Sequence, residues 1–142
     1  MANIVPDSFK TDLLKGTFNF DSAGGSTFNL ALYTSSASFS TATSSYSATN
    51  EVSGTGYVAG GQALTNNGVA ISSNIAYVDF DDETWTSASI TARYGLIYKS
   101  SASNEAVLVL DFGGDKTSTN GDFTVAFPAA SDSAAIIRLG DA

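Results

Sequence analysis

The acidic residues between positions 79 and 83 are the side chains best placed for chemistry in this sequence. Asp79, Asp81, Asp82 and Glu83 follow one another at the end of an alternating apolar segment. Such carboxylates could hold Ca²⁺, which takes about six to eight oxygen ligands, or serve as a glycosidase pair facing across a cleft. The spacing lacks the glycine of an EF-hand loop, and a single segment supplies all the acids. We favour a solvated turn in which Asp79 and Asp81 are structural, and leave Ca²⁺ binding open.

Other familiar catalytic and cofactor patterns are missing. The sequence has no histidine and no cysteine, so it lacks the usual general base near neutral pH and thiolate chemistry. Its many serines have no Ser-x-x-Lys motif to activate a nucleophile. The glycine-rich segment 54–61 is not followed by the Lys-Ser/Thr of a phosphate loop. We therefore predict a protein that is not an enzyme and has no cofactor, and we assign no metal-ligating residue beyond the open question of Ca²⁺ at 79–83. We expect the glycines to permit bulges and close backbone approach.

Arg93 lies in the middle of an apolar segment that predicts a strand. On strict alternation, Ile90, Ala92, Tyr94, Leu96 and Tyr98 share one face, and Arg93 lies on the other. An arginine in this setting either pairs with a carboxylate of the same fold or lies at an interface. We favour the pair, with Asp79, Asp81 or Asp111 as partner, because a buried guanidinium needs hydrogen-bond acceptors.

Four aromatic residues could form a sugar-binding platform: Trp85, Tyr57, Tyr94 and Tyr98. In a small β-sandwich, such residues more often belong to the core or its rim. We therefore assign Trp85 a structural role and keep carbohydrate binding as an alternative.

The charge pattern argues against some partners. The net charge is −8, and the six basic residues are scattered singly along the chain. Phosphate backbones and anionic membrane surfaces are bound by clustered lysine and arginine. The longest apolar run, 106–110, is far too short to span a bilayer. We predict that the protein binds neither nucleic acid nor membrane.

One helix is predicted, over residues 7–15. Asp7 or Ser8 is a suitable N-cap, and Gly16 can take the left-handed position after the last turn. A helix of two turns is unstable alone. Its apolar residues Phe9, Leu13 and Leu14 must therefore dock, either on this domain's own sheet or on a neighbouring subunit.

After the helix, the pattern changes to the period-two alternation of strands. About eight short strands are predicted, at 27–33, 62–64, 69–71, 75–80, 89–99, 106–112, 122–127 and 134–139. Asn120-Gly121 predicts a tight hairpin turn before 122–127. No crossover helices, linkers or repeats interrupt them. We predict one all-β domain over residues 1–142, an antiparallel β-sandwich that is jelly-roll-like, with the single helix at its N-terminal end.

Residues 34–50 form a long Ser/Thr/Ala-rich excursion in which Phe39 and Tyr46 are the only large apolar anchors. Long loops in compact domains are usually functional or ordered by a partner. A short edge strand with two turns is an equal alternative. We select Phe39 and Tyr46, together with the helix residues Phe9, Leu13 and Leu14, as candidate intermolecular contacts.

Several segments resemble a family of short virion proteins encoded among the structural genes of tailed bacteriophages. The segments are 30–35, 49–61, 84–94, 111–113 and 120–124, and the resemblance extends over about residues 8–139. The Asn50-Glu-Val-Ser-Gly-Thr-Gly-Tyr57 and Trp85…Thr-Ala-Arg93 blocks are the most specific. The resemblance implies a virion component, assembled in the host cytoplasm, and carries over no catalytic residue.

Two roles within a virion are compatible with that resemblance. A capsid decoration (cement) protein binds the major capsid protein on the outer shell and joins neighbouring capsomers, often as a trimer. A tail- or fibre-associated protein joins the tail or touches the host. The short chain, without a repetitive stalk or heptads, favours decoration.

Overall fold

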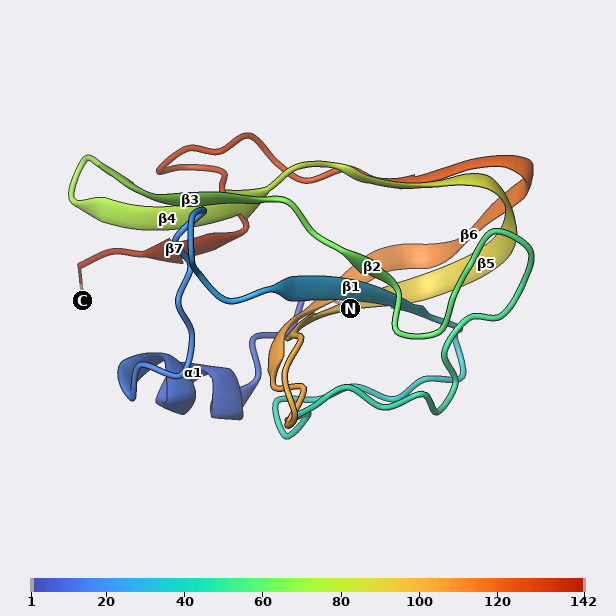
Figure 1. The fold of residues 1–142 in the computed structure, drawn as a ribbon, viewed down its shortest axis with the longest axis horizontal. Helices are drawn as coiled ribbons and strands as arrows, with labels where there is room; N and C mark the ends of the chain where they lie inside the picture. Colours follow the sequence, from blue (N-terminus) through green and yellow to red (C-terminus); the bar gives the residue numbers. More distant parts are fainter. Residues whose placement is uncertain (1, 142) are drawn as a thin grey trace.

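The chain folds as two antiparallel sheets and one helix in the computed structural model, which describes residues 2–141 (Figure 1). The elements of this part of the chain are α1 (Asp7–Leu14), β1 (Phe28–Tyr33), β2 (Gln62–Ala63), β3 (Asn66–Ser72), β4 (Ile75–Phe80), β5 (Glu83–Lys99), β6 (Ala106–Val125) and β7 (Ile137–Leu139). One sheet has the order β2-β1-β5-β6 and the other β3-β4-β7. The predicted all-β, sandwich-like fold is confirmed.

The two longest strands form one bent ribbon that connects the layers. In Figure 1 the β5–β6 ribbon turns over at the right-hand end, so that its outer part returns above β1 toward β4. The bend falls where the pairing passes from Ala92–Lys116 to Tyr94–Asp111 and β6 uses more residues than β5. Gly113 occupies this bulge with φ +79°, a conformation open to glycine at little cost.

Two predictions about this ribbon were wrong. Residues 106–112 and 122–127 are not separate strands, because β6 runs continuously through most of both. Asn120-Gly121 is not a hairpin turn. It forms a bulge inside β6, where Asn120 has φ +47° and its backbone N–H donates to Ser89 Oγ at 2.9 Å. Asn-Gly fits both structures, since each needs a residue at positive φ.

The core consists of two clusters, one on each side of the first sheet. The larger lies between the sheets and contains Phe28, Leu30, Trp85, Val107 and Phe123 among others. The smaller lies on the outer face of β1, β5 and β6. Ile90 and Ala92 belong to the first cluster, whereas Leu96 and Tyr98 belong to the second. The predicted single face of this strand is therefore wrong, because the irregular register near the bend changes which face each residue occupies.

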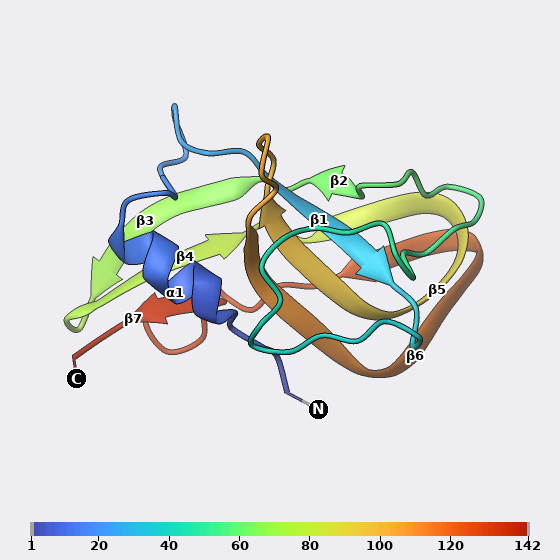
Figure 2. The same ribbon diagram turned by 90° about the horizontal axis from the view of Figure 1, so that it is seen from below.

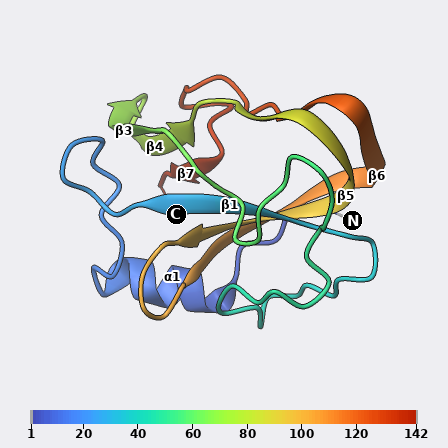
Figure 3. The ribbon, with the colours of Figure 1, turned by 45° about the vertical axis from the view of Figure 1, so that its right-hand side comes forward.

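Residues 34–50 cover the outer face of the first sheet (Figure 3). Ser45 forms an isolated antiparallel bridge with Glu105. Phe39 packs edge-on against Tyr33 and Tyr94, and Tyr46 stacks on Tyr98 with ring centroids 4.8 Å apart. The excursion is therefore an ordered lid over this chain's own sheet, and β1 is buried on both faces as a result.

Helix α1 lies on the lower side of the molecule in Figure 1, and it is in front of β3 and β4 in the view from below (Figure 2). Pro6 is the residue at the N-cap, and no side chain caps this end, so the expected cap by Asp7 or Ser8 is absent. Gly16 has φ +78°, and its N–H donates to Leu13 O at 3.1 Å, as predicted for the C-terminal end. Phe9 is buried against Phe18 and Phe20. The helix therefore docks on its own domain.

Candidate docking surface

Exposed apolar side chains gather at one end of the molecule. Six large apolar residues are exposed within residues 2–141, and they are Val5, Leu14, Val58, Val69, Ile71 and Leu139. Leu14 on α1, Val69 and Ile71 on β3, and Leu139 on β7 belong to elements in the left-hand part of Figure 1, and Val5, which precedes α1, lines the same groove as Leu14 and Leu139. We call the set Val5, Leu14, Val69, Ile71 and Leu139 the apolar end. Exposed patches of this kind usually mark interaction sites.

The register of the second sheet explains why this end is apolar. Val69, Val78 and Ile137 form one cross-strand row, and Ile71, Ala76 and Leu139 form the next. Residues directly opposite one another project from the same face. Val78 is buried in the core, whereas Ile71 is 74% and Leu139 62% exposed. The core-facing side of this sheet therefore continues into solvent beyond the part that the first sheet covers.

A groove of about 590 Å³ separates α1 from β7. We call it the end groove. Its apolar lining comes from three elements distant in sequence, chiefly through Phe9, Leu13, Leu14, Val107, Leu108 and Leu139. The chain thus places an apolar channel directly beside a short outer strand.

The charged residues that line the end groove are Lys10 and Arg138, both basic, although the chain carries a net charge of −8. Lys10 Nζ pairs with Asp7 Oδ1 at 2.8 Å. Arg138 Nη1 donates to Ser133 O at 2.7 Å, and within residues 2–141 no carboxylate forms an ion pair with it. The groove is therefore a locally basic, apolar site on an acidic protein.

The structure divides the five candidate contact residues. Leu14 is 86% exposed at the apolar end, and Leu13 is half-buried beside it. Phe9 is buried in the core, because α1 uses it to dock on its own domain. Phe39 and Tyr46 belong to the 34–50 lid and are half-buried against the first sheet. Of the five, Leu14 presents the most surface to a partner.

Sequence reasoning missed Val5, which precedes the helix, and three strand residues of the apolar end, Val69, Ile71 and Leu139. Strict alternation assigns the three strand residues to the covered side of their strands, and nothing local indicates where that cover ends. Ile71 is the exception, because it lies two residues before the Ser73-Asn74 turn, near the exposed tip of a hairpin.

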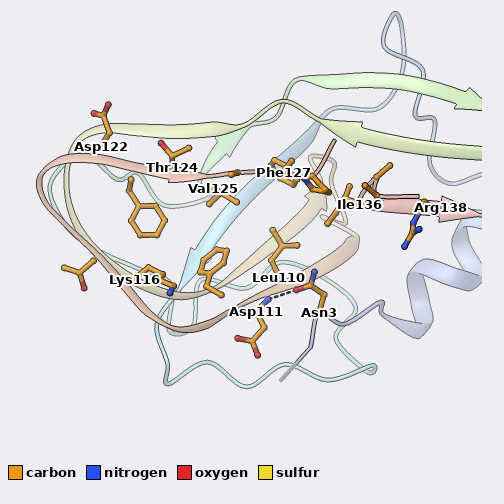
Figure 4. A pocket seen from close by; sticks show the side chains of 17 residues that line it. Asn3, Leu110, Asp111, Lys116, Asp122, Thr124, Val125, Phe127, Ile136 and Arg138 are labelled. Atoms are coloured by element: carbon orange, nitrogen blue, oxygen red, sulfur yellow. Dashed lines mark hydrogen bonds between the residues drawn. The ribbon is translucent and has the colours of Figure 1, made fainter. Parts of the chain in front are cut away.

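A second cavity, of about 760 Å³, lies in the bend of β6 beside the segment that leads to β7 (Figure 4). Lys116 and Arg138 lie at opposite ends of it in this view. Asn3 Oδ1 accepts a hydrogen bond from the Asp111 backbone N–H at 2.9 Å. Because Asp111 and Asp122 also line the cavity, its charges are mixed and select no single class of ligand.

Arg93 pairs with Asp111, one of its three predicted partners. Arg93 Nε and Nη2 donate to the two carboxylate oxygens at 2.9 and 3.3 Å. Asp111 Oδ1 also accepts the Gly113 N–H at 2.9 Å. The Arg93 hydrogen bond, followed by that of Gly113, lowers the pKa of Asp111 from 3.8 to about 2. The pair therefore fixes the bulge at which the β5–β6 ribbon bends.

Replacing Arg93 with alanine is expected to lower the melting temperature at pH 7 by on the order of a few degrees. The carboxylate of Asp111, whose side chain is only 1% exposed, would lose the two hydrogen bonds that it accepts from the guanidinium group. Lys116→Ala is the control. It removes a cation from the same ribbon, but Lys116 forms no ion pair within residues 2–141. Equal melting temperatures for wild type and Arg93→Ala would contradict the structural role.

The same pair predicts a pH dependence. The folded-state pKa of Asp111 is below its ordinary value, so the stabilisation is complete above about pH 4 and disappears as pH falls through about 2. Asp111→Asn should therefore be less stable than wild type at pH 7, and the two melting curves should converge near pH 2. A constant difference across this range, measured by circular dichroism, would refute the linkage.

The acidic segment does not assemble into one site. Asp79 is buried, with Oδ1 accepting the Phe80 N–H at 2.9 Å, whereas Asp81 is exposed and its N–H donates to Thr65 O. Asp82 Oδ1 accepts the Phe127 N–H at 2.7 Å. Burial raises the pKa of Asp79 and of Glu83. Residues 2–141 contain no group of three or more carboxylates placed to hold a metal ion.

The proposed aromatic platform is also not assembled. Trp85 is buried and lies with Tyr57 in the cluster between the sheets. Tyr94 and Tyr98 belong to the cluster on the opposite face of the first sheet. With its amide oriented to satisfy both neighbours, Gln62 donates to Glu83 and accepts from Trp85 Nε1 at 3.1 Å. Trp85 is therefore a core residue with a satisfied indole N–H, as its structural assignment predicted.

Glu51 organises the loops above β1, a role that sequence reasoning missed. Its carboxylate accepts hydrogen bonds from Tyr46 Oη at 2.7 Å, Tyr57 Oη at 2.6 Å and the Gly60 N–H at 2.7 Å. Tyr57 Oη in turn accepts the Leu32 N–H at 2.9 Å. Burial, followed by the bond to Glu51, raises the pKa of Tyr46 and Tyr57 well above the usual range. Glu51 thus ties the 34–50 lid to the glycine-rich segment 54–61.

Within residues 2–141, α1 is too short to cross a bilayer, and no helix there has a membrane-spanning apolar stretch. Comparisons with protein-family models, with curated proteins and with solved structures gave no match. By its fold and its candidate surface, the protein is a small all-β domain with one apolar end.

Proposed function

We propose that this protein is a structural component of a tailed-bacteriophage virion, a capsid decoration protein that binds the major capsid protein on the outer shell and joins neighbouring capsomers. The observation that carries the proposal is the apolar end, in which five apolar side chains are exposed and three of them, Val5, Leu14 and Leu139, line the same groove. A surface of this kind is costly in water and is typical of a protein that binds another protein. The non-enzymatic, cofactor-free role is part of the same proposal.

The resemblance of the 49–61 and 84–94 segments to short phage virion proteins supports the virion assignment. Residues of these two segments stabilise the fold itself. Glu51 and Trp85 hold the loops and the core, which leaves the apolar end for contact with a partner. Self-association as a trimer on the shell belongs to the proposal, because bracing capsomers requires more than one contact surface.

Cryo-electron microscopy of intact particles tests the location. Density that fits this fold at the three-fold or quasi-three-fold axes of the capsid, with the apolar end against the shell, is the expected result. Density confined to the tail would replace decoration with the tail-associated alternative. Particles that contain none of the protein would overturn the virion assignment.

The double variant Leu14→Asp, Leu139→Asp should weaken binding to shells assembled without this protein by at least about tenfold. Both side chains are well exposed, so the change in folding free energy should stay within about 0.5 kcal/mol each. Val58→Asp is the matched control, since Val58 is equally apolar and 75% exposed but is not part of the apolar end. Co-sedimentation measures the binding, and equal loss in the control would refute the assigned surface.

A further inference from the structure

We propose that the end groove receives an extended segment of the partner protein, which adds as a new strand to the free edge of β7. The inference rests on the proposed function and deepens it, because it states what kind of segment the partner supplies. That segment carries apolar side chains at alternate positions and at least one Asp or Glu between them.

The two sheets differ in how their edges are covered. The edge of β6 is covered by the N-terminal segment, since Ile4 and Val109 exchange two backbone hydrogen bonds of 2.9 Å. β3 and β7 are the end strands of the second sheet, and within residues 2–141 β7 pairs with β4 alone. An uncovered edge presents backbone donors and acceptors that readily pair with another extended chain. Peptide recognition by strand addition uses edges of this kind.

The free edge of β7 borders an apolar channel. Ile137 and Leu139 on β7, and Leu13 and Leu14 on α1, line the end groove. Successive side chains of a strand point to opposite sides, so an added strand would direct every second side chain into this channel. Backbone pairing supplies affinity, and the channel selects apolar residues at alternate positions.

The charge of the end groove favours a different protein over a second copy of this chain as the partner. The charged residues lining the groove are Lys10 and Arg138. Two copies meeting groove to groove would place these like charges opposite one another, which is unfavourable. Arg138 has no ion pair with a carboxylate in residues 2–141. A segment with an acidic residue beside Arg138 would supply that partner.

Titration of the isotopically labelled protein with synthetic peptides tests the proposal by NMR. The probe is a capped peptide of about eight residues, longer than β7, with alternating Val and Glu. We expect shifts at the amides of Ile137, Arg138 and Leu139 and at the methyl groups of Leu14 and Leu139. A Val/Lys peptide should bind at least about tenfold more weakly. Shifts confined to other parts of the protein would overturn the proposal.

Two variants sharpen the test. Arg138→Glu should reduce or reverse the preference for the Val/Glu peptide, while Val58→Asp should leave it unchanged. A Val/Glu peptide methylated at alternate backbone nitrogens, on the edge that would pair, should not bind, because it cannot donate to β7. Equal binding of the methylated peptide, or an unchanged preference in Arg138→Glu, would refute strand addition.

The outcomes separate this inference from the proposed function. If the protein binds phage shells but the Val/Glu peptide causes no shifts at β7, strand addition is overturned and the decoration role stands. If the peptide binds at β7 but the protein binds no particle, the decoration role fails and the strand-addition site stands.

Discussion

Gly61→Ala is expected to destabilise the protein by at least about 4 kcal/mol, a large part of the roughly 5–15 kcal/mol by which folded proteins are stable. Gly61 has φ +75°, and a Cβ atom there would overlap the carbonyl oxygen and carbon of Leu30. The left-handed conformation alone costs an L-residue roughly 1–2 kcal/mol. The overlap adds more, because the obstruction is the backbone of β1, which is buried and paired with β5.

Gly16→Ala is the control for Gly61→Ala. Gly16 has φ +78°, close to that of Gly61, but no atom lies within 4 Å of a Cβ placed there. Gly16→Ala should therefore lower the free energy of unfolding by only about 1 kcal/mol. Trp85, the single tryptophan and 1% exposed, reports unfolding by urea through its fluorescence. Similar losses for the two variants would show that the close approach of Gly61 to β1 is unimportant.

Glu51→Ala has the second-largest expected effect, a loss of about 3 kcal/mol and on the order of 10 °C in melting temperature. The carboxylate accepts three hydrogen bonds of 2.6–2.7 Å, and bonds to charged groups are the stronger kind. Without it, the hydroxyl groups of Tyr46 and Tyr57 would lose their acceptor within the fold. The 34–50 lid should then exchange its amide hydrogens faster than β1 does.

Glu105→Ala provides the matched control. Glu105 accepts a side-chain hydrogen bond from Ser101, four residues away, so its removal should change the stability by less than about 1 kcal/mol. Among the tyrosines, Tyr57→Phe should cost more than Tyr46→Phe, because the N–H of buried Leu32 also depends on Tyr57 Oη. A larger drop in melting temperature for Tyr46→Phe than for Tyr57→Phe would contradict this network.

The glycine-rich block illustrates how far sequence reasoning could go. The absence of a Lys-Ser/Thr continuation argued against a phosphate loop, and close backbone approach was the predicted use of the glycines. Gly61 against Leu30 agrees with that prediction. The role of Glu51 was not predictable, because its partners Tyr46, Tyr57 and Gly60 come together only when the loops fold over β1.

The candidate site was less predictable than the fold. Leu14 was recognised because a short amphipathic helix must dock on something, but the same reasoning also selected Phe9, which the fold buries. The carboxylate partner of Arg93 was narrowed to three acids, and only the bend of the β5–β6 ribbon brings Asp111 to it.

The sequence by itself determined the features that depend on local pattern and composition. Period-two alternation predicted antiparallel strands, the scattered basic residues argued against phosphate-backbone binding, and a short apolar helix was placed at 7–15, against Asp7–Leu14 in the structure. Tertiary structure alone decided that β6 is continuous and that Asn120-Gly121 is a bulge. It also decided that the residues of the apolar end, Leu14 and Leu139 among them, are exposed. The physical reason is that alternation is set by each strand separately, whereas register, bending and burial depend on pairing between segments far apart in the chain.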